Sequence, residues 1–144
     1  MTVQRPVGQR PLSTTDIATY MGGLAVGLAL THLTIVAVDD GMVTAIGGFV
    51  LAVVAIFIAG FMYVRRAAIA QRRHAFYVLH VIAFLLVNAS FWLHALLAHS
   101  STTSDDIIVS WRGALLTMPL VWSVGLLLHT IGTIFAKGYE HVDV

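Results

Sequence analysis

The sequence predicts an all-α integral membrane protein, a four-helix bundle with both termini in the cytoplasm (N-in/C-in). Of its 144 residues, 58% are hydrophobic and only 10% are charged, which is typical of a membrane protein rather than a soluble domain. Four long apolar runs contain no Asp, Glu, Lys or Arg in their interiors. Each run is close to the twenty or so residues that a helix needs to cross a bilayer. The predicted spans cover residues 17–38, 42–64, 75–98 and 114–135.

Outside these four spans, too few residues remain for a separate soluble domain. Residues 1–16 are expected to form a cytoplasmic tail, residues 17–135 the membrane domain, and residues 136–144 a cytoplasmic C-terminus. We see no signal-peptide pattern, because the first residues are polar and the following apolar run is too long. The chain has no cysteine, which excludes disulfides, thiolate metal sites and cysteine-ligated clusters.

The first span begins after Ser13, Thr14, Thr15 and Asp16, whose side chains are typical helix N-caps. Within this span, Gly23 and Gly27 form a small-xxx-small pattern that would let a neighbouring helix approach closely. His32 lies in its outer third. The following Asp39-Asp40-Gly41 predicts a tight turn.

The second span has three glycines but no histidine and no charged residue, so we expect it to serve helix packing. A dense positive cluster follows it, which the positive-inside rule assigns to the cytoplasm. The two loops on the other side carry mainly acidic residues, and this asymmetry predicts the N-in/C-in orientation. The cluster contains Arg65, Arg66, Arg72, Arg73 and His74, and the acidic residues are Asp39, Asp40, Asp105 and Asp106.

The third span carries polar side chains in an otherwise apolar run: His80, Asn88 and His94. At about 100° per residue, His80 and His94 share one helix face, and at about 1.5 Å per residue they lie about 21 Å apart. Ionisable groups within a span are rare enough to indicate function.

A polar outer loop is expected from His99 to Arg112, with the stretch from Ile107 to Trp111 at the membrane interface. The fourth span follows. Pro119 is tolerable near its start, and Met118 and His129 lie on one face of it, with about 20° between them.

The segment 74–137 resembles the 2TM domain family, a membrane helical hairpin. In the first helix the matching residues are Phe76, Tyr77, His80 and Asn88, and in the second they are Trp111, Pro119, Trp122, Gly125 and His129. The sequence departs from the family at Phe84, where tyrosine is common, and at Ser123, where glycine is usual. The resemblance implies a hairpin with a His/Asn pattern and no settled activity.

Because the third and fourth spans run in opposite directions, His80 and His129 are expected at the same depth near the cytoplasmic side. His32 and His94 are matched in the same way near the outer side, together with Met118. Two facing imidazoles can hold the iron of a b-type haem. We therefore predict haem b at His80/His129, with a second at His94 and either His32 or Met118, in an electron-transfer subunit.

Other interpretations stay open. His80, Asn88 and His129 could be interhelical hydrogen-bond partners that keep the hairpin in register. The protein would then be a non-catalytic accessory or scaffolding subunit that docks to a larger membrane complex or forms a homo-oligomer. A neutral histidine could also ligate a chlorophyll-type pigment, with Ser90 and Gly125 one turn before a histidine giving it space. A zinc or copper site of histidine and outer aspartates is a further alternative, although these aspartates are first explained as solvated loop residues.

The sequence gives little support for an enzyme. There is no Ser/His/Asp arrangement, no intramembrane carboxylate to relay protons, and no intramembrane lysine for a Schiff base. The expected partners are the lipid bilayer and other membrane subunits, with no nucleic acid. The expected location is the cytoplasmic (inner) membrane of a prokaryote, such as a bacterium.

Overall fold

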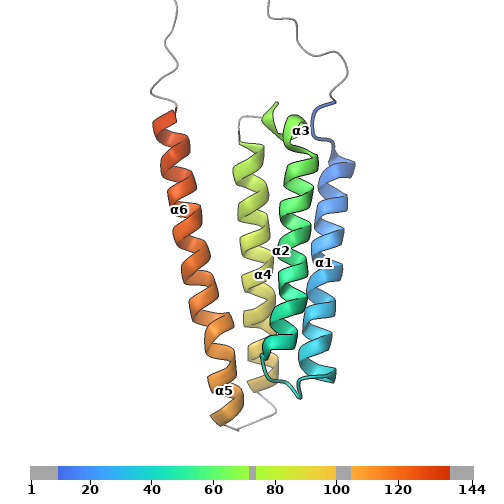
Figure 1. Ribbon diagram of the computed structural model, residues 1–144, viewed down its shortest axis with the longest axis vertical. Coiled ribbons are helices and arrows are strands. Elements are labelled where there is room, and N and C mark those ends of the chain that lie inside the picture. The colour runs from blue at the N-terminus through green and yellow to red at the C-terminus, as the bar shows by residue number, and fades with distance from the viewer. Residues whose placement is uncertain (1–9, 72–73, 100–104, 137–144) are drawn as a thin grey trace, which may run out of the picture.

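The computed structural model describes residues 10–71, 74–99 and 105–136, and all regular structure in these residues is helical (Figure 1). Four segments are long and apolar enough to cross a membrane, Thr14–Ala37, Ala45–Val64, Ala75–Ala98 and Val109–Leu128, which confirms an all-helical chain of membrane type. The elements are α1 (Thr14–Ala37), α2 (Ala45–Val64), α3 (Arg66–Ala70), α4 (Ala75–His99), α5 (Asp105–Arg112), the π-helical η1 (Gly113–Thr117) and α6 (Met118–Ala136).

The start of α1 and the end of α6 lie at one end of the structure, beside α3 (Figure 1). We call this the α3 end, and the opposite end the α5 end. Consecutive long helices therefore run in opposite directions, as short connections favour. The two parallel helices α1 and α4 are in contact along the structure.

The first helix begins with Ser13 as its N-cap, one of the predicted candidates, and the cap is a capping box with Asp16. Ser13 N–H donates to Asp16 Oδ2 at 2.9 Å, and Asp16 N–H donates back to Ser13 Oγ at 3.2 Å. Asp16 has a second role that no local sequence pattern indicates. Its carboxylate is 4% exposed and pairs with Arg65, at 2.7 Å from Asp16 Oδ1 to Arg65 Nη2. This ion pair connects the start of α1 with the end of α2.

The predicted small-residue face of α1 packs against α2. Gly23 lies against the ring of Phe57, and a Cβ at Gly27 would lie 2.8 Å from Val54 Cγ2. Because glycine has no Cβ, the two backbones approach more closely here than larger residues would allow. The α1–α2 pair is the most extensive helix contact among the described residues.

The core consists of two clusters stacked along α1, α2 and α4. The cluster near the α3 end is centred on Tyr20, whose hydroxyl donates to the Leu79 carbonyl of α4 at 3.2 Å. The cluster near the α5 end adds Trp111 from α5. The buried members of the first are Leu12, Tyr20, Leu24, Val54, Ile58, Met62, Ile69, Leu79 and Ala83, and those of the second are Leu28, Ile35, Val87, Phe91, Trp111 and Ala114.

The fourth membrane segment differs from the prediction. The expected loop from His99 to Arg112 is wrong in its second half, because α5 is already helical from Asp105. Two aspartates at a helix N-terminus favour its formation. After α5 the backbone hydrogen bonds change from the α-helical to the π-helical pattern. Met118 N–H donates to the Gly113 carbonyl, five residues back. Pro119 has no N–H and cannot donate an α-helical hydrogen bond. The π-helical turn ends just before this proline.

At the α5 end, two hydrogen bonds join this segment to the turn between α1 and α2. Trp111 Nε1–H donates to the Gly41 carbonyl at 2.9 Å, and Val43 N–H donates to Ser110 Oγ at 3.3 Å. The predicted tight turn is present, with φ of 50° at Asp40 and 82° at Gly41. Glycine reaches this left-handed region without steric cost.

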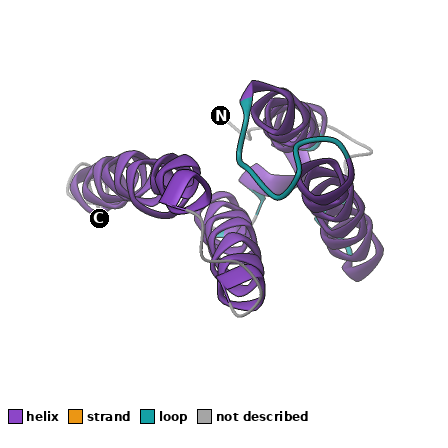
Figure 2. Ribbon diagram, turned by 90° about the horizontal axis from the view of Figure 1, so that it is seen from below, coloured by secondary structure: helices purple, strands orange, loops and turns teal. Residues whose placement is uncertain are grey.

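Helix α6 is peripheral. It packs mainly against α4, and the two helices diverge toward the α3 end (Figures 1 and 2). Only 11% of the span that enters α6 is buried, against 28% for α1. The arrangement is therefore three packed helices with a fourth leaning on one of them, rather than a closed bundle.

Candidate functional site

The structure brings His32 of α1 and His94 of α4 together, as their matched depth predicts. Their Nδ1 atoms are 2.8 Å apart. Phe91 packs on the ring of His32 with 4.8 Å between centroids, and Trp111 packs on His94 at 4.9 Å. The two imidazoles are therefore hydrogen-bonded directly to each other inside an aromatic setting.

This geometry corresponds to the hydrogen-bonding interpretation of the outer pair. Metal–imidazole bonds are about 2.0–2.1 Å long, so two nitrogens on opposite sides of one ion lie about 4 Å apart. Iron between His32 and His94 would require the two helices to separate. Met118, the alternative partner for His94, lines a cavity with Val87 and Trp122, and His94 is not part of the wall of that cavity.

The surroundings of the two histidines indicate which ring nitrogen of each carries the proton. Of two facing Nδ1 atoms, one must donate and the other accept. Nε2 of His32 is buried and has no hydrogen-bond partner among the described residues. A buried N–H without an acceptor is rarer than a buried nitrogen lone pair without a donor. We therefore assign the donated proton to Nδ1 of His32, which leaves a lone pair on its Nε2. His94 then carries its proton on Nε2.

His80, the residue at the centre of the predicted inner site, lies on α4 near the α3 end. Its Nδ1 is 3.0 Å from the Phe76 carbonyl. A carbonyl can only accept, so Nδ1 carries the proton and the lone pair of the neutral ring is on Nε2. Metal-binding histidines are commonly oriented in this way, by donating the other ring N–H to a backbone carbonyl.

Two adjoining cavities open beside His80. One, of about 440 Å³, lies between α2, α4 and α6, and its wall includes Ala55, Ala59 and Trp122. The other, of about 260 Å³, lies between α4 and α6, and Gly125 forms part of its wall. The larger of the two lies within the size range of small-molecule sites, about 300–1,000 Å³. Small residues from α2 and α6 thus leave space next to the imidazole.

His129 lies on α6 one helical turn beyond Gly125, so both residues are on the face of α6 that borders the His80 cavities. The predicted depth match with His80 agrees with this placement. The side chain of His129 lies outside the described residues.

Asn88 lies two turns from His80 on α4 and does not contact it directly. It is 9% exposed, and its Nδ2 donates to the Phe84 carbonyl at 2.7 Å. Its Oδ1 is buried without a hydrogen-bond partner among the described residues. Phe84, between the two residues, packs edge-on against Trp122 of α6, with 5.7 Å between centroids.

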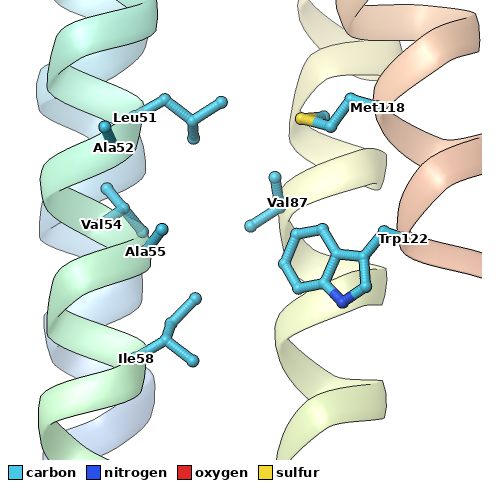
Figure 3. A pocket seen from close by; sticks show the side chains of 8 residues that line it. All are labelled: Leu51, Ala52, Val54, Ala55, Ile58, Val87, Met118 and Trp122. Atoms are coloured by element: carbon cyan, nitrogen blue, oxygen red, sulfur yellow. The ribbon is translucent and has the colours of Figure 1, made fainter. Parts of the chain in front are cut away.

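The cavity beside His80 belongs to a longer cleft, which was not predicted from the sequence. A third cavity, of about 290 Å³, continues toward the α5 end, where Leu51 and Val54 face Met118 and Trp122 across Val87 (Figure 3). Trp122 lines all three cavities. The small side of α2, with Ala52, Ala55 and Ala59, would have been the only sequence signal for this cleft.

No group of three or more His, Cys, Asp or Glu side chains within metal-binding reach occurs in the described part of the chain. Of the outer aspartates, Asp39 is buried and accepts a hydrogen bond from Gly47 N–H at 3.2 Å. This contact helps to satisfy the free amides at the start of α2. The side chains of Asp105 and Asp106 lie outside the described residues.

Comparison of this chain with protein-family models, curated proteins and solved structures gives no match, so the resemblance to the 2TM domain stays a prediction.

Proposed function

We propose that the protein is a small haem-b-binding membrane protein that carries single electrons, with His80 and His129 as axial ligands. The observation that supports this most is the hydrogen bond from His80 Nδ1 to the Phe76 carbonyl, because the neutral ring then has its lone pair on Nε2, the atom that would bind iron. The cavities beside His80 provide space between α2 and α6. A bound haem would supply an iron centre that changes oxidation state by one electron.

The residues around the site have defined roles in this proposal. Phe76 orients His80 through its carbonyl and packs on the imidazole, with 4.5 Å between ring centroids. Ala55 and Ala59 leave room on the α2 side, and Gly125 does so on the α6 side. The apolar walls of α2 and α6 would limit access of water, which helps to set a reduction potential.

Filling the cavity tests the proposal without removing a ligand. A Cβ at Gly125 would meet no atom within 4 Å, so leucine fits the fold there but extends into the space beside His80. We expect Gly125→Leu to lose haem absorbance and retain its helical circular dichroism.

Gly60→Leu is the matched control. It lies on α2, also has no atom within 4 Å of a Cβ, and lines none of the three cavities of the cleft. It should keep the haem. Equal haem content in the two leucine variants would contradict a cofactor in this cavity.

The proposed orientation places the α3 end in the cytoplasm of a prokaryotic cell. Arg65 and Arg66 lie at this end, and Asp39 and Asp40 lie at the other, which is the charge distribution of the positive-inside rule.

Single-cysteine labelling checks the orientation unambiguously, because the chain has no cysteine of its own. In intact cells, an impermeant maleimide should label Ser104→Cys in the α4–α5 connection, and should label exposed Ala70→Cys only after lysis. The reverse pattern would place the α3 end outside.

A second candidate is a non-catalytic subunit that docks to a larger membrane complex or to another copy of this chain. The low burial of the span that enters α6 favours it. Exposed apolar side chains form one face of this helix, among them Leu120, Val124 and Leu127. A purified protein without haem that co-purifies with another membrane subunit would favour this function.

A further inference from the structure

A separate groove runs between α1 and α4 in the half of the protein near the α5 end. It has a volume of about 480 Å³, and its polar wall consists of His32, His94 and Ser90. The rest of the wall is apolar and includes Ala29, which is exposed, and Leu93. It shares no lining residue with the cavities beside His80. Its position between two membrane-spanning helices opens it to the lipid phase.

The groove presents one donor and one acceptor on adjacent turns of α4. In the tautomer assigned above, His94 carries its proton on Nε2, and the hydrogen bonds described for His94 use only Nδ1. The hydroxyl of Ser90 donates to the Val87 carbonyl at 2.8 Å, which leaves the lone pairs of its oxygen as acceptors. The spacing of four residues puts both groups on one face.

The histidine pair is held in place from both sides. His32 supplies the proton that His94 Nδ1 accepts, and Trp111 packs against the ring of His94. Trp111 is itself fixed by its hydrogen bond to the Gly41 carbonyl. A donor with so little rotational freedom costs less conformational entropy when it binds a ligand.

We propose that this groove binds a neutral, lipid-soluble quinone, with the ring between α1 and α4. The quinone carbonyl accepts a hydrogen bond from His94 Nε2–H, and the hydroxyl of the corresponding quinol can donate to Ser90 Oγ. The wall contains no Asp, Glu, Lys or Arg, so it matches an uncharged head group rather than a phosphate or an ammonium group. This site does not depend on haem at His80.

Photoaffinity labelling tests the site. The full chain in phosphatidylcholine nanodiscs is irradiated with an azido-quinone, with and without excess decylubiquinone, and labelled peptides are located by mass spectrometry. We expect labelling that the unlabelled quinone displaces, on the segments around Ala29 in α1 and around Ser90 to His94 in α4.

Two variants separate the groove from general partition into lipid. Ala29→Phe fills the groove while both histidines stay in place, and His94→Leu removes the donor. Each should lower the labelling by about tenfold, the effect of losing about one hydrogen bond or an equivalent contact. Ala25→Phe, one turn away at an exposed position outside the groove, should label like the wild type. If His94→Leu fails to fold, Ala29→Phe alone still tests whether the labelling depends on the groove.

Equal labelling in Ala29→Phe, Ala25→Phe and the wild type would overturn the proposal. So would labelling of the same segments by a photoactivatable phosphatidylcholine with the same dependence on Ala29, because the occupant would then be a phospholipid. Neither readout uses absorbance, so failure here is distinguishable from failure of the haem proposal.

Discussion

Gly23→Leu is expected to destabilise the protein strongly. A Cβ at this position would overlap the ring of Phe57, which stacks on Tyr20 with 6.2 Å between centroids. The ring therefore cannot move aside without disturbing the core at the α3 end. Overpacking of this kind costs about 1–3 kcal/mol or more, and here it would also force apart the largest helix contact of the structure.

The neighbouring Gly22 provides a matched control, because a Cβ there meets nothing within 4 Å. Gly22→Leu makes the same chemical change in the same helix and should leave the stability within about 0.5 kcal/mol of wild type. Thermal unfolding in a mild detergent, followed by circular dichroism, compares the two. Equal midpoints for both variants would mean that α1 and α2 do not pack through Gly23.

Removing either inner histidine is expected to abolish the haem absorbance. His80→Ala and His129→Ala should each eliminate the same Soret band, because iron would be left with one strong axial ligand. His32→Ala should keep that band, since His32 is hydrogen-bonded to His94 near the α5 end, whereas His80 lies near the α3 end.

A stricter form of the experiment adds free imidazole to His80→Gly. Recovery of the band would identify a lost ligand rather than a lost fold. If His80 and His129 were only hydrogen-bonding residues, each substitution would cost about 0.6–2 kcal/mol of helix association and change no spectrum.

Much of the fold could be predicted from the sequence, because long apolar runs have few other solutions in a membrane. The ends of α2 and α4 fall within a few residues of their predicted limits, and Ser13 forms the expected cap. The segment before Arg112 was misassigned because its polar residues resemble a loop, although Asp105 also suits a helix N-terminus.

The divergence of α6 could not be predicted. Lipid tails solvate a leucine surface as well as another helix does, so apolar composition alone does not decide how tightly a helix packs. The closeness of His32 and His94 followed from matched depth, whereas their direct hydrogen bond depends on the approach of α1 to α4 around Phe91. The ion pair of Asp16 joins residues far apart in the sequence and carries no local pattern.

The absorption spectrum of the purified wild-type protein tests the central proposal most directly. The protein should be produced in haem-supplemented cells and measured after oxidation and after reduction by dithionite. We expect a Soret band, a sharp α-band on reduction, and about one haem per chain bound through two histidines. A colourless protein from these cells would contradict the proposal and leave the docking subunit as the function of this fold.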